Sequence, residues 1–419
     1  MKALIEIFRL ELVALMRSGT MALLTAASVL WLVAFPFLAR GDGTAEGARE
    51  LYLRYSFGGV FAILVVCLLA SATGTLARER TARRLQLTLV RPVRYFSIAL
   101  GKIAAHVLVG AFVLVVAALI VFFRSGTNVR CNHVLSPVLL SPAEEAKLMY
   151  DEYMKDPSTP DEVRKAPKAT VLRLLTQRAI DHYQTISTNA VAKWKFEGLG
   201  DSVGLAVRMR FTNQFEMRQD VVGTFRLGGL TGAVSNITQA VLTVPLKGAA
   251  AQSARTGEVE LSFANGGGHP VMLRPRKDLN LLVSADSFAA NLLRSCLVMV
   301  FVLAFVIAFG TFLSAALSRP VALFVAIVML LVSEMSPSVL EQYPDALETD
   351  SLDRIGLTMT RAAAELTHPI SSLSPLETLS KDECVENRLV VRAGLVNFLA
   401  LPVLFALLSA FVLPRKQED

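Results

Sequence analysis

Long apolar runs, separated by polar stretches, form the dominant pattern along this chain. A helix that crosses about 30 Å of hydrocarbon needs roughly 20 mostly apolar residues. Six runs approach or exceed that length, so the pattern predicts six transmembrane helices at about 21–38, 57–76, 98–123, 289–317, 321–334 and 391–413. The fifth run is short unless it begins before Pro320, and five spans or a re-entrant segment there remain open alternatives.

The residues ahead of the first run predict an amphipathic helix. Lys2, Glu6 and Arg9 recur at steps of four and three, while Leu4 and Phe8 fall elsewhere around the helix. A helix with separate charged and apolar faces is typical of the membrane interface. The alternative is that these residues simply extend the first span. The first span also begins too late to belong to a removable signal peptide.

Residues 124–288 contain no apolar run long enough to cross, which predicts a water-exposed domain. Its first part, 141–190, has helical signals. Ser141 with Glu144, and Thr159 with Glu162, each form a capping pattern with Pro at the first helical position. A third helix is predicted over 168–186 from apolar residues at helical spacing.

From about residue 193 the pattern changes to a period of two. Val207, Met209 and Phe211 alternate with arginines, as is typical of half-buried strands. Strands are predicted at 207–211, 221–225, 240–246, 258–263 and 279–283. Their Gly-rich connections predict a small antiparallel β-sandwich over 193–284. The fold class is therefore an α-helical polytopic membrane protein with an inserted extracytoplasmic α+β domain.

Residues 335–388 are too polar to cross a membrane. With four prolines and one short helix predicted at 351–366, they are expected to cap the outer face of the bundle. The predicted domains are thus 1–123, with the interfacial helix and the first three spans, 124–288 outside, and 289–419, with the last three spans and this cap.

Composition agrees with a membrane protein. Hydrophobic residues make up 53% of the chain and charged residues only 18%, whereas a soluble domain carries about 25% charged residues. The formal net charge of +7 could point to nucleic acid. Many basic residues lie in loops beside the spans, however, so anionic lipid headgroups are the favoured partner and nucleic acid is not expected.

The loop between the second and third runs concentrates positive charge. Its arginines are Arg78, Arg80, Arg83, Arg84, Arg91 and Arg94. Such a cluster next to membrane helices stays on the cytoplasmic side. Both termini are then cytoplasmic, residues 124–288 lie outside, and the chain is a multi-pass protein of the cytoplasmic (inner) membrane.

The same loop has more specific features: Glu79, leucines at every second position, the step from Arg91 through Pro92 to Arg94, and Gly101 followed by Lys102. With the six spans and the N-terminal helix, it resembles the first cytoplasmic loop of ABC-2 type transporter permeases. The resemblance implies a dimer of like or unlike permease subunits, each docked to a cytoplasmic ABC ATPase. Carried over, the docking loop, or coupling helix, would comprise Glu79, Arg80, Arg83, Arg84, Leu85, Leu87, Leu89, Arg91, Pro92 and Arg94.

The docking role has a physical basis, because arginines can pair with acidic residues while the leucines fill an apolar groove. The alternative is that these arginines only bind lipid phosphates and fix the topology. The large outer domain departs from the family pattern of short loops after the third span. No substrate follows from the resemblance.

The residues indicate no chemistry of the chain's own. Zinc-protease and serine-hydrolase motifs are absent, and the five histidines lack ligand spacing. A nucleotide-binding loop at Lys102 would need Gly where Phe96 stands and Ser or Thr where Ile103 stands. We therefore expect no enzyme activity, no metal and no cofactor in this chain, with ATP bound by the partner.

Charge within the spans also bears on function. The runs contain only His106, Arg294, Glu334 and the amide of Asn397 as notable polar groups. Ion-coupled transporters are expected to bury ionisable groups near the midplane, so the pattern favours a permease driven by another protein. The alternative function is a membrane-anchored envelope protein whose outer domain binds a protein or glycan.

The four cysteines divide into two pairs. Cys67 and Cys296 lie within spans and are predicted to be packing residues. Cys131 and Cys384 both fall outside the membrane, each close to a span. In an oxidising compartment they could form a disulfide, and two unrelated thiols are the alternative.

Overall fold

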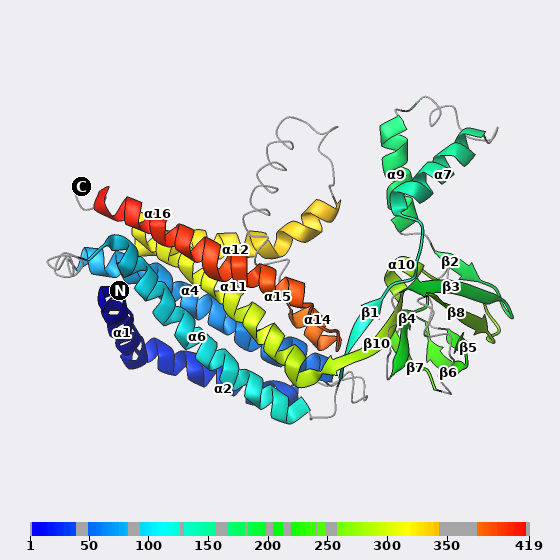
Figure 1. Cartoon of the computed structure of the whole chain (residues 1–419), viewed down its shortest axis with the longest axis horizontal. Coiled ribbons are helices and arrows are strands. Elements are labelled where there is room, and N and C mark those ends of the chain that lie inside the picture. Colours follow the sequence, from blue (N-terminus) through cyan, green and yellow to red (C-terminus); the bar gives the residue numbers. More distant parts are fainter. Residues whose placement is uncertain are drawn as a thin grey trace. The chain divides into compact units, whose positions relative to one another are not determined.

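The computed structural model describes residues 2–38, 49–82, 93–125, 130–155, 166, 168–180, 183–197, 204–212, 219–238, 241–247, 258–342 and 375–415. Contacts divide the chain into two compact units (Figure 1). One unit joins Met1–Val129 to Ser287–Asp419 and is helical. The other, Arg130–Asp286, contains every strand among the described residues apart from the last residue of β10 (Leu279–Ser287).

The helical unit is built from α1 (Lys2–Arg17), α2 (Gly19–Leu38), η1 (Tyr52–Phe57), α4 (Gly58–Thr81), α6 (Tyr95–Ser125), α11 (Phe288–Ala316), α12 (Arg319–Gln342), α14 (Leu376–Ser380), α15 (Asn387–Ala393), η3 (Gly394–Ala400) and α16 (Leu401–Arg415). The segments η1 and η3 are π-helical turns within longer helices. A turn of this kind widens a helix locally without ending it.

Four of the six predicted runs lie in helices that are long and apolar enough to cross a membrane: Arg49–Thr81, Tyr95–Arg124, Phe288–Ala316 and Asn387–Pro414. The first run is long and apolar enough only when the helix Met21–Phe35 is counted together with α1 as one bent span. With that pair included, the described residues contain at most five spans. The fifth run corresponds to Arg319–Val332, a shorter apolar helix. At 1.5 Å per residue this apolar part is shorter than the hydrocarbon core, although α12 itself continues to Gln342, so the structure does not establish six spans.

Helix α11 forms the centre of the bundle. Helices α4, α6 and α16 pack against it, and 72% of the most apolar 18-residue stretch of α11 is buried within the structure. Its core side chains include Leu303, Val306 and Ile307. Hydroxyls within it are satisfied locally, since Thr311 donates to the carbonyl of Ile307 at 2.8 Å. These hydroxyls of α11 therefore do not need hydrogen-bond partners on neighbouring helices.

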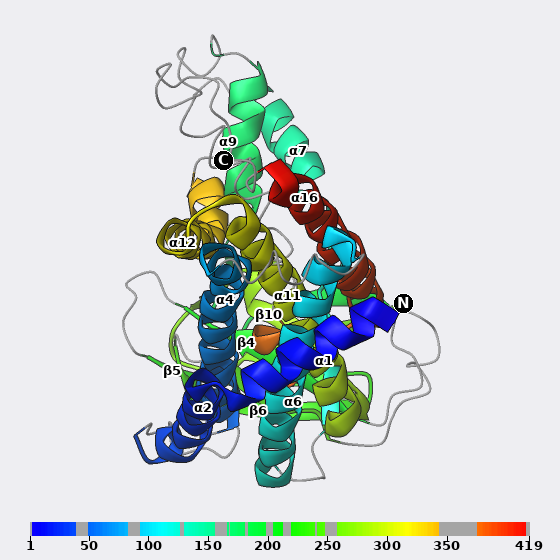
Figure 2. The same ribbon diagram turned by 90° about the vertical axis from the view of Figure 1, so that its left-hand side faces the viewer.

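Helix α1 is a separate element and does not continue α2 in a straight line. The axes of Lys2–Arg17 and Met21–Phe35 differ by 61°. In Figure 2, α1 runs across α6, against which it packs. The bend argues against simple extension of the first span. The interfacial position of α1 stays a prediction, although its apolar residues Leu10, Val13 and Met16 are exposed.

In the described part of the second unit the strands form two four-stranded sheets and one two-stranded sheet, with orders β1-β10-β4-β7, β3-β8-β5-β6 and β2-β9. The strands are β1 (Arg130–Leu135), β2 (Gln184–Ile186), β3 (Val191–Glu197), β4 (Leu205–Arg210), β5 (Asp220–Leu227), β6 (Leu230–Ile237), β7 (Val241–Pro245), β8 (Glu258–Asn265), β9 (Val271–Leu273) and β10 (Leu279–Ser287). All five predicted strands are present within these ranges or one residue beyond them. Isolated bridges of Thr231 with Lys247 and of Thr212 with Met272 link the sheets, and the strands that the structure describes do not form a closed sheet.

One hydrophobic core is shared by the two larger sheets. Trp194, Phe225 and Phe263 come from one sheet, while Val207 and Leu281 come from the other. The register pairs Trp194 with Leu261 and Val207 with Leu281. Alternation along each strand places these residues on the inner face, as the period of two predicts.

The helices of this unit are α7 (Pro142–Lys155), α9 (Lys168–Ile180) and the short α10 (Pro275–Asp278). The predicted start of α7 is confirmed: Glu144 accepts hydrogen bonds from the Ser141 hydroxyl and amide, at 2.6 and 3.0 Å. The prediction for 168–186 is wrong at its end, because Ile186 lies in β2 and is buried in the sheet core. The start predicted at Thr159 lies outside the described residues.

The predicted outer cap is described only in part. Helix α12 continues as far as Gln342, and the helix predicted at 351–366 lies outside the described residues. In the described remainder, the buried side chain of Asn291 donates to the Glu383 carbonyl at 2.7 Å and accepts from the Val385 amide at 2.8 Å. These bonds fix the segment around Cys384 to the start of α11.

Candidate functional site

The predicted docking loop is described only at its two ends. Glu79 and Arg80 occupy the last turns of α4, and Arg94 precedes α6. The remaining predicted residues, Arg83, Arg84, Leu85, Leu87, Leu89, Arg91 and Pro92, lie outside the described residues. The docking helix itself therefore stays a prediction, but the structure shows what its ends contact.

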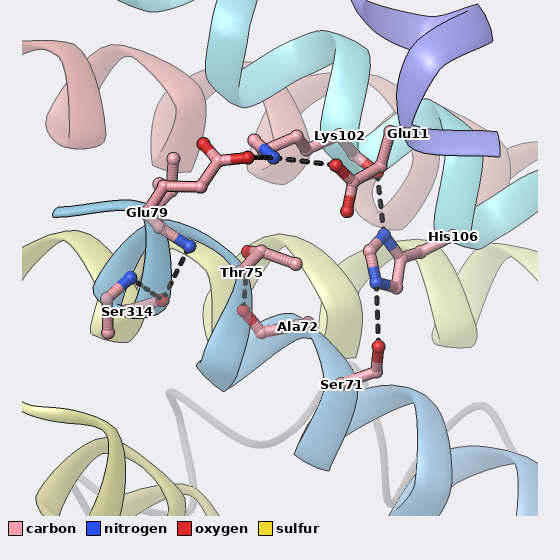
Figure 3. Close-up of polar contacts among 10 residues, drawn as sticks. Glu11, Ser71, Ala72, Thr75, Glu79, Lys102, His106 and Ser314 are labelled. Carbon is pink, nitrogen blue, oxygen red and sulfur yellow. Dashed lines mark hydrogen bonds and ion pairs between the residues drawn. The ribbon is translucent and has the colours of Figure 1, made fainter. Parts of the chain in front are cut away.

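A buried ionic cluster lies beside these loop ends. The ammonium of Lys102, on α6, is 2.6 Å from the Oε2 of Glu11 on α1 and 2.8 Å from the Oε1 of Glu79 on α4 (Figure 3). The Lys102 side chain is only 3% exposed, compared with 13% for Glu11 and 30% for Glu79. One cation thus joins three helices.

His106 continues this cluster one turn further along α6. Its Nδ1 donates to the Lys102 carbonyl at 2.9 Å, because a carbonyl can only accept. Its Nε2 is 3.1 Å from the Ser71 hydroxyl on α4, which is therefore the donor when the imidazole is neutral. The histidine side chain is fully buried, and both of its ring nitrogens are satisfied.

The close approach of α1 depends on Gly101. A Cβ placed on this glycine would lie 3.0 Å from Cγ2 of Ile7 and 3.3 Å from the carbonyl oxygen of Leu4. Any side chain there would press on α1. The absence of one lets α1 lie against α6, so that Glu11, one helical turn beyond Ile7, reaches Lys102.

The end of α4 is also bound to α11. The amides of Leu76 and Ala77 both donate to the Ser314 hydroxyl, at 3.1 and 3.0 Å (Figure 3). Arg80 donates to the carbonyls of Ala315 and Leu317, at 3.0 and 3.2 Å. These carbonyls belong to the last turn of α11 and its C-cap, so the Arg80 guanidinium caps that helix end.

The balance of charge makes this cluster unusual for a helical bundle. Two carboxylates face a single ammonium, and taking such groups out of water costs several kcal/mol per ion. The hydrogen bonds to Lys102 offset part of that cost. A buried ion pair therefore contributes little to the net free energy of folding. Its better-attested role is to favour one arrangement of the elements that it joins.

The sequence pattern alone does not reveal this site. The expectation that the spans are almost free of charge is wrong for Lys102, because that residue lies within the helix Tyr95–Arg124. Arg80 is predicted to take part in docking, and that role stays a prediction; the structure shows that its guanidinium binds carbonyls of α11 and its C-cap. One available signal was the spacing of Lys102 and His106, four residues apart on one face of an otherwise apolar helix.

The remaining predicted sites give a mixed result. Cys67 and Cys296 are free thiols packed within helices, as predicted. Cys131 and Cys384 are both buried, at 1% and 8% exposed, and belong to different units. Their pairing stays a prediction. Within the described residues, no group of three or more His, Cys, Asp and Glu side chains is arranged to hold a metal ion.

Comparison with protein families, with curated proteins and with solved structures gives no match for this chain. Function is therefore inferred from the geometry of the bundle and from the residues of the loop.

Proposed function

We propose that this chain is the membrane-spanning permease subunit of an ABC-type transporter. It would move a substrate across the cytoplasmic membrane with energy from ATP hydrolysed by a separate ATPase subunit. In this proposal the α4–α6 end of the bundle is cytoplasmic, a second permease subunit completes the pathway, and α2 and α12 supply the fifth and sixth crossings.

The observation that carries the proposal is the cluster of Lys102, Glu11 and Glu79. Glu79 lies at the start of the Arg-rich loop, so a force on that loop reaches the Lys102 ammonium directly, and through it α6 and α1. Arg80 and Ser314 connect the same end of α4 to α11. An input at the loop would therefore move several helices together, as alternation between inward-open and outward-open arrangements requires.

The position of the cluster also favours this reading over ion-coupled transport. Lys102 is the eighth residue of α6, so it lies about 10 Å along the helix axis from the start of that helix. Ion-coupled carriers place their binding groups near the midplane of the bilayer. A cluster near one end is better placed to receive a mechanical input than to bind a transported ion.

The test is co-purification of an ATPase from native membranes. Arg83, Arg84 and Arg91 are changed together to Glu, which reverses the charge of the loop. We expect the associated ATPase activity and its polypeptide to be lost, because acidic partner residues are then repelled. The matched control reverses Arg54, Arg388 and Arg392, three exposed arginines outside this loop.

Two results would count against the proposal. An ATPase retained by the loop variant would remove the docking role. A wild-type protein that brings down envelope proteins or glycan through residues 130–286, and no ATPase, would support the alternative of a membrane anchor for the outer domain.

A further inference from the structure

Two arginines at the loop end of the bundle face each other across Gly74. A Cβ placed on Gly74 would lie 3.2 Å from the Nε of Arg78, on α4, and also 3.2 Å from the Nε of Arg319, the first residue of α12. The two guanidinium groups therefore lie side by side over one buried glycine. A side chain at this position would push them apart.

This pair lacks a counter-charge within the described part of the chain. Neither the Arg78 side chain nor the Arg319 side chain makes an ion pair or a hydrogen bond to a residue that the structure describes. Both side chains are exposed, so an external group can reach them. Their neighbour Arg80 is already engaged with backbone carbonyls of α11 and its C-cap. Two like charges held together without a partner favour an anion between them.

Exposed apolar residues further along α12 indicate what carries that anion. Val321, Phe324 and Val328 lie along one side of α12, about half a turn around the helix from Arg319, and they are 47%, 67% and 38% exposed. A free phosphate would leave these side chains uncovered. A phospholipid would place its phosphate between the guanidiniums and its acyl chains along α12.

We propose that Arg78 and Arg319 form a binding site for the phosphate of an anionic phospholipid. The site is independent of the docking role, since it uses neither Glu79, Arg80 nor the residues between Arg83 and Pro92. The two guanidiniums supply charge-assisted hydrogen bonds to the phosphate oxygens, and the net negative headgroup neutralises the pair. A zwitterionic headgroup carries its own cation and gains less from this site.

Binding is measurable by native mass spectrometry of the full chain in detergent, titrated with phosphatidylglycerol or phosphatidylcholine. We expect phosphatidylglycerol to bind more tightly, and the variant R78Q/R319Q to lose roughly tenfold or more of that affinity. The matched control is R388Q/R392Q, which removes two exposed arginines from α15 and should leave the affinity unchanged.

Two further measurements distinguish a phospholipid from a free phosphate compound. A large excess of glycerophosphoglycerol, which is the headgroup without acyl chains, should not displace the lipid. F324S should weaken phosphatidylglycerol binding while leaving the guanidiniums intact. Displacement by the headgroup alone, or equal lipid binding by R78Q/R319Q and the wild type, would overturn the proposal. Thermal unfolding of each variant, compared with R388Q/R392Q, ensures that lost binding is not lost folding.

Discussion

At the scale of single residues, Lys102 decides how the loop end of the bundle is held. Changing Lys102 to Met leaves the Glu11 and Glu79 carboxylates facing each other without a cation. Removal of one partner from a buried pair is strongly destabilising, and we expect a loss of about 3 kcal/mol. Thermal or denaturant unfolding in detergent, with the wild type alongside, measures it.

The control for this prediction neutralises the whole cluster. The triple variant E11Q/E79Q/K102M removes both carboxylates together with the ammonium, so no charge is left unpaired. We expect it to recover most of the lost stability. A triple variant as unstable as K102M alone would show that lost packing, and not unpaired charge, is responsible.

Single residues also show where sequence reasoning stops. Cys67 and Cys296 could be placed in the packed bundle from hydropathy alone. The partners of Lys102 are 91 and 23 residues away along the chain, and no local period relates them. The charge of Arg80 fits a docking residue. Its bonds to carbonyls of α11 and its C-cap could not be predicted, because only helix packing brings those carbonyls within reach.

At the scale of elements, local signals that are satisfied within one turn predict structure well. The start of α7 is an example, because Ser141 and Glu144 bond to each other and need nothing distant. The end of α9 shows the opposite. Ile186 fits the helical period, but pairing with Val271 in β9 places it in a strand. Tertiary pairing overrides local period in that case.

The same capping interaction predicts a dependence on pH. Hydrogen bonds from the Ser141 hydroxyl and amide hold the pKa of Glu144 below its ordinary value. A lowered pKa in the folded state means that this contribution is present above the unfolded value and is lost as pH falls through the folded one. We therefore expect α7 to lose backbone protection selectively on going from pH 7 to about pH 3.

Hydrogen exchange of residues 142–155, corrected for intrinsic rates, measures this effect. Glu144→Ala should lower protection at pH 7 and make it less sensitive to pH. Glu152→Ala is the matched control, since it removes an exposed carboxylate from the same helix without touching the cap. Equal responses of the two variants would contradict the role of the cap.

At the scale of the whole molecule, the disulfide between Cys131 and Cys384 would connect the two units covalently. Chain elements near one of these positions are well fixed, since Asn291 binds the residues on both sides of Cys384. We expect non-reducing peptide mapping to recover a cross-linked pair of peptides. Cys131→Ser should then release a Cys384 thiol that alkylates after denaturation. Full alkylation of both cysteines in unreduced wild type would exclude the bond.

The orientation of the whole chain is the last requirement of the proposed function. The docking loop must face the ATP-containing compartment, and the β-rich unit must face the other side. A membrane-impermeant maleimide applied to intact cells should therefore label Lys193→Cys, an exposed position on β3, but not Arg84→Cys. Permeabilised cells should show labelling of both, which controls for the reactivity of each site. Labelling of Arg84→Cys in intact cells would place the loop outside the cell, where no cytoplasmic ATPase can bind it. The positive-inside rule would then have failed for this chain.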